Sequence, residues 1–336
     1  LLSTFPDTRL AEPGEFTRRA MENGKLDLTQ VEGLGDLIEA ETEAQRKQAL
    51  RVLSGHLGQR VDEWREKLIR AAALLEVTID FADEDVPVDV SGEVRELLNA
   101  VNNDLLREIQ GTHTAERIRT GFEVAIIGKP NAGKSTLLNA LAGRDAAITS
   151  SIAGTTRDVI EVRMDMGGLP VTLLDTAGLR EGADEVEAIG IDRALSRAAA
   201  ADLRVFLVEE GEDLPVEAKP DDIRLLPKAD LRDDPSGSIS GVTGQGVSDL
   251  IAQVQSVLTT RSLTAGLATH ERHRVALQKA ADGLAFAMSV LDHGPDQYDI
   301  AAEELRHSIR ALEALVGRID VENLLDVIFA SFCLGK

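Results

Sequence analysis

Apolar residues recur every three to four positions through the first and last thirds of the chain, which is the period of an α-helix. The sequence TQVE at residues 29–32 predicts a helix start, since Thr followed three positions later by Glu is a capping box, and the segment it opens runs toward Gly55. Residues 272–291 and 300–332 repeat the helical period. The early helical faces are predicted from Val31, Leu34, Leu37 and Ile38, from Val61, Trp64, Leu68, Leu75 and Ile79, and from Val94, Leu97, Leu98, Val101, Leu105 and Ile109.

The middle of the chain alternates short apolar runs with longer amphipathic segments. The runs predict strands at residues 123–127, 159–164, 171–174, 203–208 and 223–226. Strands that alternate with helices form a mostly parallel sheet. The simplest architecture is an α/β domain inserted into a helical bundle that both flanks build, with junctions at residues 117–121 and 261–266. Two independent helical domains are the alternative.

Composition and charge limit the kind of protein. With 336 residues the chain has room for two or three domains, and one cysteine excludes a disulfide framework. No apolar stretch approaches the ~20 residues that cross a bilayer, and no signal-peptide pattern is present, so the chain is predicted to be cytoplasmic. A net charge of −22 opposes nonspecific attraction to nucleic-acid phosphates, so RNA contact requires a local basic patch or a partner.

Two other polar features are predicted to be solvated. The acidic stretch at residues 209–222 is predicted to be an exposed loop. The six histidines lack metal-ligand spacing, with His270 and His273 the nearest pair, and all six are predicted to face solvent.

The sequence GKPNAGKS at residues 128–135 lies between an apolar run and an amphipathic segment, as a P-loop requires. A strand delivers the chain to a glycine-rich turn, whose backbone N–H groups and helix start favour phosphate. Lys134 is expected to reach the β- and γ-phosphates, and the Ser135 hydroxyl to ligate Mg²⁺. The predicted nucleotide-binding residues here are Asn131, Ala132, Gly133, Lys134, Ser135 and Thr136.

Two further motifs follow in the order typical of GTP hydrolases. DTAG at residues 175–178 follows an apolar run, so that Asp175 is placed to hold Mg²⁺ through water and the Gly178 N–H to meet a γ-phosphate. GTTRD at residues 154–158 lies between the two motifs, and the hydroxyl of Thr155 or Thr156 can complete the magnesium shell. We assign Thr156 to magnesium and Thr155 to the nucleotide. A solvated turn and a polar loop are the alternatives for the two motifs.

Base recognition is predicted at PKAD, residues 227–230, where the usual pattern is Asn-Lys-x-Asp. Asp230 can accept both the N1–H and the exocyclic amine hydrogens of guanine, and the Lys228 stem can cover the base. Pro227 lacks the side-chain amide of an Asn. Ser240 and Gly241 are predicted to contact the nucleotide, within an SGV sequence where such proteins often carry Ser-Ala-Lys. Guanine is therefore favoured, with modest affinity.

Three further segments carry a resemblance to a known family. They are AEPGEFTRRAMENGKLDLTQVEGLGDLI at residues 11–38, the run LREGADEVEAIGIDRA after DTAG, and the terminal FCLGK. Together with the motifs above, they resemble the MnmE (TrmE) tRNA-modification GTPases over nearly the whole chain. The resemblance implies a multidomain α and α/β fold, with a helical bundle that carries an inserted Ras-like P-loop GTPase domain. The implied boundaries are residues 1–10 for the end of an N-terminal folate-binding domain, 11–118 and 263–336 for the helical domain, and 119–262 for the GTPase domain.

The same resemblance implies GTP hydrolysis with Mg²⁺ and K⁺, and a homodimer formed through the G domains. It also implies an FAD-dependent partner, MnmG (GidA), in a heterotetramer that installs a carboxymethylaminomethyl group at C5 of the wobble uridine of certain tRNAs. A folate one-carbon donor is expected only with the missing N-terminal domain.

Catalytic residues follow partly from the chemistry and partly from the resemblance. Phosphoryl transfer needs charge neutralisation and an oriented water, and DTAG is followed by Leu179 and Arg180 rather than by Gln. The resemblance implies that Glu187 orients the water, with Arg180 as a second candidate; a helix-start carboxylate is the alternative for Glu187. It also implies that Cys333 acts in tRNA modification, although a lone cysteine is commonly a small buried hydrophobe.

The resemblance further implies a potassium site that stands in for an arginine finger. Its ligands are Asn131 and a loop at residues 144–155 that contributes Thr149, Ile152 and Thr155, with Thr149 also counted among the nucleotide contacts. A turn-forming role is the alternative for Asn131.

Two other classes of protein share some of these features. A ribosome-assembly GTPase explains the motifs but not the helical flanks or FCLGK, and ribosomal RNA would stimulate it. A nucleotide-regulated binding module explains Pro227 and Val242, and a nucleotide titration distinguishes it.

Overall fold

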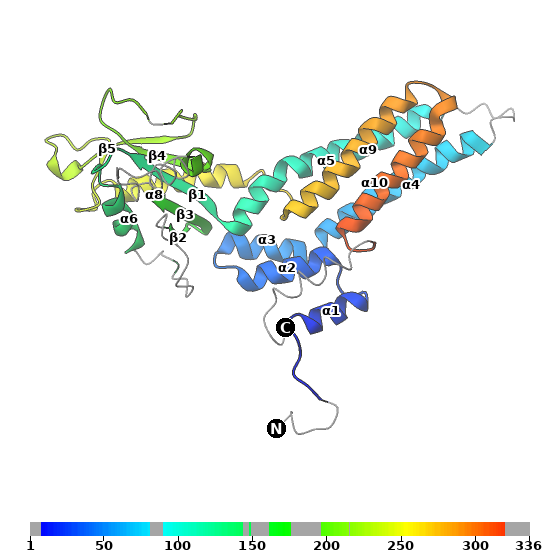
Figure 1. Ribbon diagram of the computed structural model, residues 1–336, viewed down its shortest axis with the longest axis horizontal. Coiled ribbons are helices and arrows are strands. Elements are labelled where there is room, and N and C mark those ends of the chain that lie inside the picture. The colour runs from blue at the N-terminus through cyan, green and yellow to red at the C-terminus, as the bar shows by residue number, and fades with distance from the viewer. Residues whose placement is uncertain are drawn as a thin grey trace, which may run out of the picture. The chain divides into compact units, whose positions relative to one another are not determined.

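The computed structural model describes residues 8–80, 90–143, 148, 161–175, 196–214 and 216–319. Its internal contacts divide the chain into two compact units (Figure 1). The helical unit contains the residues up to Ala40, Arg46–Glu116 and the residues from Ala265 onward. The sheet unit contains Glu41–Gln45 and Arg117–Thr264. The predicted fold class, a helical bundle with a mostly parallel α/β domain, is confirmed.

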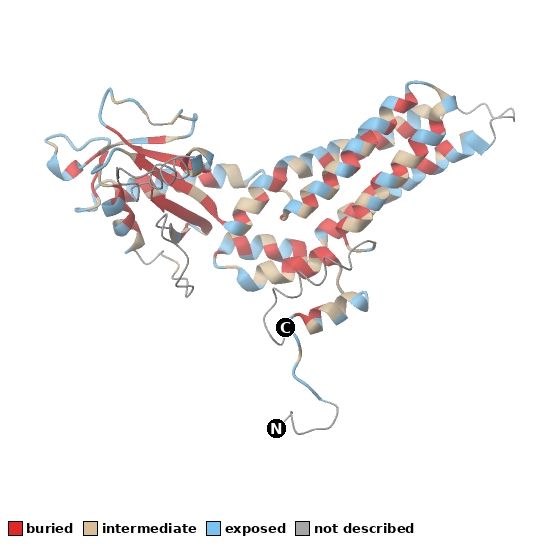
Figure 2. Cartoon of the chain, viewed as in Figure 1, coloured by how far each residue is buried: buried red, intermediate tan, exposed pale blue. Residues whose placement is uncertain are grey.

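Four long helices form the body of the helical unit, and their buried positions run along each of them (Figure 2). Their shared core includes Trp64, Leu98, Leu284 and Leu305, which are fully buried. Burying each such leucine contributes about 1.5–3 kcal/mol. Ile38 and Ile79, predicted on apolar faces, are instead 38% and 37% exposed. The helices are α1 (Glu15–Glu22), α2 (Leu28–Glu39), α3 (Glu43–Leu53), α4 (His56–Asp80), α5 (Ser91–Thr120), α9 (Glu271–Leu291) and α10 (Tyr298–Leu315), with the short 3₁₀ turn η4 (Pro295–Gln297).

Helix α2 starts before the predicted position. Its N-cap is Asp27, whose carboxylate accepts the Gln30 amide at 2.8 Å while Gln30 Oε1 accepts the Asp27 amide at 3.0 Å. Asp27 and Gln30 have the same spacing as the Thr29 and Glu32 of the TQVE motif. The local sequence therefore does not show which of the two pairs forms the capping box. The predicted capping residues Thr29 and Glu32 lie inside the helix and are buried.

Two helices are shorter than predicted. The segment toward Gly55 is divided between α2 and α3, because Ala40 is extended and Gln45 Oε1 accepts the amides of Glu41 and Thr42, each at 3.0 Å, at the start of α3. The helix predicted to continue to residue 332 ends at Leu315, since Gly317 adopts φ 81 and a Cβ there would lie 2.6 Å from Leu28 Cβ.

The sheet unit contains a six-stranded sheet in the order β2-β3-β1-β4-β5-β6. Only the β2–β3 pair is antiparallel among these strands. All five predicted strands are present in the described residues, and β6 was not predicted because two residues form no apolar run. The elements are β1 (Phe122–Gly128), α6 (Lys134–Ala142), β2 (Glu161–Met166), β3 (Leu169–Asp175), β4 (Leu203–Leu207), β5 (Ile223–Pro227), η3 (Ala229–Leu231), β6 (Ser238–Ile239) and α8 (Val247–Ser262).

The connection from β4 to β5 contains no helix among its described residues. The prediction that this acidic stretch is simply solvated is wrong at its end. Asp222 is 3% exposed and pairs at 2.7 Å with Arg204 of β4, which is equally buried. A buried guanidinium requires a carboxylate as its counter-charge, so the Asp222 side chain is buried next to Arg204. In the part of the chain that the structure describes, no helix is long and apolar enough to span a membrane.

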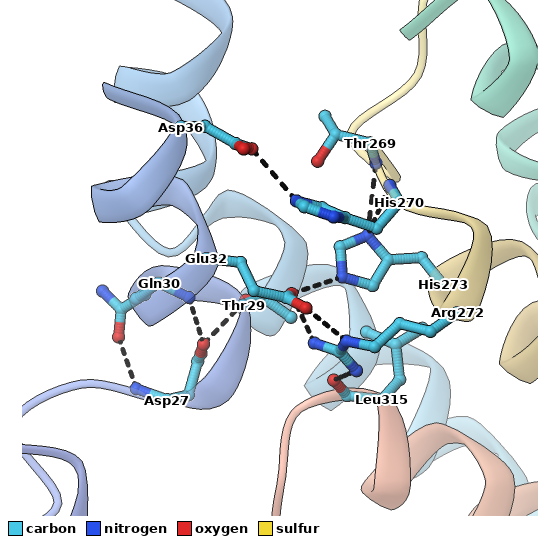
Figure 3. A network of polar contacts seen from close by, with 10 residues as sticks. All are labelled: Asp27, Thr29, Gln30, Glu32, Asp36, Thr269, His270, Arg272, His273 and Leu315. Carbon is cyan, nitrogen blue, oxygen red and sulfur yellow. Dashed lines mark hydrogen bonds and ion pairs between the residues drawn. The ribbon is translucent and has the colours of Figure 1, made fainter. Parts of the chain in front are cut away.

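A buried polar network joins α2 to the start of α9 within the helical unit (Figure 3). Arg272 donates to both oxygens of Glu32, each at 2.5 Å, and to the Leu315 carbonyl at 2.8 Å. His273 Nε2 lies 2.8 Å from the same carboxylate. The charges of Glu32 and Arg272 are therefore paired and hydrogen-bonded, as burial demands.

The prediction that His270 and His273 face solvent is wrong. His273 is fully buried, and its Nδ1 accepts the amides of Thr269 and His270 at 3.2 and 3.4 Å, which caps α9. His270 Nε2 lies 3.1 Å from Asp36. Because Nδ1 is an acceptor, the proton is on Nε2 and points at Glu32. The burial of His273 and the contact of His270 with Asp36 both depend on a helix distant in sequence, which local spacing cannot reveal.

Burial lowers the pKa of His273 to about 4. Burial by itself would raise the pKa of the Glu32 carboxyl. The hydrogen bonds from His273 and Arg272 outweigh this effect and hold the pKa of Glu32 well below its ordinary value. The network is thus a carboxylate and a guanidinium with a neutral imidazole beside them.

Candidate functional site

The P-loop connects β1 to α6 at the carboxyl edge of the sheet. Asn131 and Gly133 have φ 63 and 92, and this pair of left-handed residues turns the chain so that α6 begins at Lys134. Gly128 allows β4 to approach, since a Cβ there would lie 2.5 Å from the Leu207 carbonyl. The backbone amides at the start of α6 therefore form an anion-binding helix terminus.

Lys134, Ser135 and Asp175 come together at this edge. The buried Lys134 ammonium donates to the carbonyls of Gly128 and Lys129 at 2.7 and 2.9 Å. Burial lowers the pKa of Lys134, and the negative charge of Asp175 opposes that shift. Asp175 ends β3, which pairs with β1 so that Asp175 faces Ile126 in register. The predicted residues from the two motifs are thus neighbours.

The donor set at Ser135 and Asp175 suits a hard cation. Ser135 Oγ donates to Asp175 Oδ2 at 2.9 Å, which places a hydroxyl and a carboxylate oxygen side by side. Magnesium prefers oxygen ligands and is commonly held by one or two protein groups together with phosphates and water. Among the described residues, no group of three or more His, Cys, Asp or Glu side chains is arranged to hold a metal. These two residues therefore fit magnesium that arrives with a nucleotide.

A cavity of about 230 Å³ extends from the P-loop to the loops after β5 and β6. The chain turns at residues 228–230, where Lys228 adopts φ 58. Ala229 is buried and anchors this turn, while Asp230 is exposed. Sequence reasoning missed the apolar residues of the lining, such as Leu207 and Ile239. They lie at the ends of strands, and no sequence motif marks them as part of a site. The lining residues are Asn131, Ala132, Gly133, Thr136, Leu137, Leu207, Lys228, Asp230, Leu231, Ile239, Ser240, Gly241 and Val242.

The loop after β6 approaches α6 closely at Gly241. A Cβ at Gly241 would lie 2.6 Å from the backbone of both Thr136 and Leu137, so glycine is required there. Ser240 Oγ accepts the amides of Val242 and Thr243 at 3.2 and 3.3 Å, which fixes the turn. Val242 is 76% exposed. The predicted residues Ser240 and Gly241 thus border the same cavity as the P-loop.

The remaining predicted site residues lie outside the described residues. They are Thr149, Ile152, Thr155, Thr156, Gly178, Arg180, Glu187 and Cys333.

Comparison with known proteins gives one family match and relatives that align with the whole chain. The family model described as the MnmE helical domain matches residues 28–333. The protein named tRNA modification GTPase MnmE from Ruegeria pomeroyi is 70% identical over 335 residues, which are 100% of this chain and 78% of that protein. The protein of the same name from Roseobacter denitrificans is 67% identical with the same coverage. A solved structure of Aquifex aeolicus Era bound to GDP·AlF4⁻ shows 22% identity over 48% of this chain and 66% of that chain, with a TM-score of 0.30.

Proposed function

The chain belongs to the MnmE family of tRNA modification GTPases and is a GTP hydrolase, and on that premise we propose which of its residues bind and act on the nucleotide. The observation that carries the proposal is that one cavity is bordered by the P-loop, by Lys228 and Asp230, and by Ser240. One side offers backbone amides that favour phosphate, and the other offers an exposed carboxylate. That pairing suits a guanine nucleotide.

The base contacts follow from hydrogen-bond chemistry. The Asp230 carboxylate accepts the guanine N1–H and an exocyclic amine hydrogen, a pair of donors that adenine lacks. The Lys228 stem covers the base, and Ser240 and Gly241 border its far side. Pro227 offers no side-chain amide, so we expect preference for GDP and GTP over ATP with modest affinity.

The phosphates lie over the start of α6. Backbone amides of residues 132–136 donate to their oxygens, and Lys134 exchanges the carbonyls of Gly128 and Lys129 for β- and γ-phosphate oxygens. Ser135 and Asp175, with Thr156, would hold Mg²⁺, which when bound neutralises charge on these phosphates.

Hydrolysis needs a positioned water and further positive charge. We assign the water to Glu187, with Arg180 as the second candidate, on the family relationship and the absence of Gln after DTAG. Potassium would be held by Asn131, Thr149, Ile152 and Thr155 when G domains pair in a homodimer. The place of Asn131 on the cavity lining supports its part of this assignment.

Hydrolysis and G-domain pairing are coupled, in this proposal, to addition of a carboxymethylaminomethyl group at C5 of the wobble uridine. The partner is the FAD-dependent MnmG protein in a heterotetramer, and a folate-binding domain supplies the one-carbon unit. Cys333 acts in the tRNA chemistry, and the protein works in the cytoplasm. The helical domain comprises residues 11–118 and 263–336, and the GTPase domain residues 119–262. Family membership and the FCLGK sequence support these assignments.

Hydrolysis rates in KCl and in NaCl test the potassium assignment, and rates no faster in KCl would overturn it. Glu187→Ala should reduce turnover by a factor of about 100 or more with GDP affinity nearly unchanged, since the group acts in the transition state. Lys134→Ala should reduce both. Normal turnover in Glu187→Ala would move the role to Arg180.

Cys333→Ser separates hydrolysis from modification. Nothing in phosphoryl transfer requires a thiol, so hydrolysis should stay near wild type while a protein that also carries the proposed folate-binding domain loses wobble-uridine modification. Full modification by the variant, measured as modified-nucleoside content, would leave Cys333 without a chemical role.

A further inference from the structure

A four-residue turn shortly after β4, residues 209–212, contacts two of the loops that border the nucleotide cavity, the P-loop and the loop after β5. The Glu212 carboxylate accepts the Glu209 amide at 2.9 Å, and the Glu209 carbonyl accepts the Glu212 amide at 3.2 Å. Gly211 adopts φ 77, which closes the turn. The result is a compact turn with a carboxylate at each end.

One end of the turn holds the P-loop. Lys129 Nζ lies 3.0 Å from Glu212 Oε1, and the Glu212 side chain is 11% exposed. The Lys129 carbonyl accepts the Ala132 amide at 3.2 Å and the Lys134 ammonium at 2.9 Å. A hydrogen bond from the Glu209 amide, followed by the contact with Lys129, lowers the pKa of Glu212, so the carboxylate is charged. Through Glu212 the turn therefore holds Lys129, whose carbonyl accepts a hydrogen bond from the phosphate-binding Lys134.

The other end holds the base-recognition segment, residues 227–230. Glu209 forms an ion pair with the Arg232 guanidinium, and Arg232 Nε donates to the Pro227 carbonyl at 2.8 Å. The Arg232 amide also donates to the Ala229 carbonyl at 3.3 Å. Arg232 thus holds Pro227 and Ala229 of this segment together and joins the segment to the turn.

We propose that the 209–212 turn is a bracket that holds the P-loop and the base-recognition segment at the separation a guanine nucleotide requires. Glu212 and Arg232 are then positioning residues that set nucleotide affinity. The inference rests on the proposed function of the cavity. Two observations explain why such a bracket is needed. No helix is found among the described residues of the β4–β5 connection, and Pro227 has neither a side-chain amide nor an N–H with which to tie its loop.

The expected size of the effect follows from exposure. Lys129 is 72% exposed and Glu209 is 56% exposed, and ion pairs with one exposed partner are individually weak. Their contribution is therefore to keep two loops ordered before the nucleotide arrives, which reduces the cost of binding. Loss of the Lys129–Glu212 pair should raise the Kd for GDP about 3- to 5-fold. Loss of Arg232, which makes two charge-assisted contacts, should raise it about 10-fold.

The test is calorimetric titration of GDP into the full chain carrying Glu212→Gln, Lys129→Gln, both together, or Arg232→Met. Glu210→Gln is the matched control, because Glu210 lies exposed in the same turn. Both single variants at the P-loop end should weaken binding, and the double variant should be no weaker than either, since one pair is lost in each case. In GTP hydrolysis the loss should appear in KM, with kcat at saturating GTP retained.

Two outcomes would overturn the bracket. One is a Kd for Glu212→Gln and Arg232→Met within 2-fold of the Glu210→Gln control. The other is a double variant whose loss is the product of the two single losses. If Arg232→Met does not fold by circular dichroism, Arg232→Lys keeps the charge for Glu209 and tests the Pro227 contact. A wild-type chain that does not prefer GDP to ADP would instead refute the guanine site, and the bracket with it.

Discussion

Replacing Glu32 by Ala tests how much of the helical unit's stability depends on its buried charge network. The change removes the carboxylate that accepts from Arg272 and His273 (Figure 3). Arg272, 20% exposed, would keep only its bond to the Leu315 carbonyl, and the His273 Nε2–H would face the vacated space. A largely buried cation would thus lose its counter-charge.

The magnitude follows from the burial of both partners. The Glu32 side chain is 6% exposed, so solvent screens the pair weakly. Removing one partner of a buried ion pair costs about 3–5 kcal/mol, because the other charge stays desolvated. Glu32→Gln keeps the shape and one acceptor oxygen, so we expect a smaller loss of about 1.5–3 kcal/mol.

Trp64 offers a direct assay of the helical unit. It is the only tryptophan in the chain and is fully buried in the core of α4, α5, α9 and α10. Its fluorescence during urea unfolding therefore reports this unit even if the sheet unit unfolds separately. With a urea dependence of about 2 kcal/mol per molar, Glu32→Ala should lower the midpoint by about 1.5–2.5 M.

Glu39→Ala is the matched control, since Glu39 is an exposed carboxylate of the same helix. We expect it to change the unfolding free energy by less than about 0.5 kcal/mol. If Glu32→Ala unfolds at the same urea concentration as Glu39→Ala, the reasoning from buried charge is refuted.

Two further predictions concern pH and packing. An unfolded histidine takes up a proton near pH 6.5, whereas burial lowers the pKa of His273 to about 4, so the unfolded state binds more protons between these values and stability falls as pH is lowered. The loss from pH 7 to 5 should be about 2 kcal/mol by Trp64 fluorescence, and an equal slope in His273→Gln would contradict it. Gly241→Val should raise the Kd for GDP at least about 10-fold, because even the valine Cβ would lie 2.6 Å from the α6 backbone. The unfolding transition reported by Trp64 should stay unchanged. Unaltered GDP binding would show that the loop after β6 is not constrained at Gly241.

The sequence predicted the sheet better than the helix ends. Apolar runs locate the strands, and P-loop and PKAD residues fall at strand ends, which a parallel sheet brings to one edge. Helix ends were predicted less accurately, since Asp27 and Thr29 both begin capping patterns and the predicted cap at Thr29 was wrong.

Contacts between distant segments were beyond sequence reasoning. The burial of His273 depends on Glu32 of another helix, and no local pattern announces that pairing. The same holds for Arg204 with Asp222, and for Arg232 at the carbonyl of Pro227. In each case the side chain looks like an ordinary surface group until its partner is known.

The most direct test of the guanine site is calorimetry of GDP and XDP with the wild-type chain and with Asp230→Asn. In the proposed site the wild-type carboxylate accepts the guanine amine, whereas an Asn amide can donate to the carbonyl that xanthine has in its place. We predict that the wild-type chain binds GDP more tightly than XDP by about 10- to 100-fold, and that Asp230→Asn reverses the preference. An Asp230→Asn protein that still prefers GDP to the wild-type extent would show that Asp230 does not read the base.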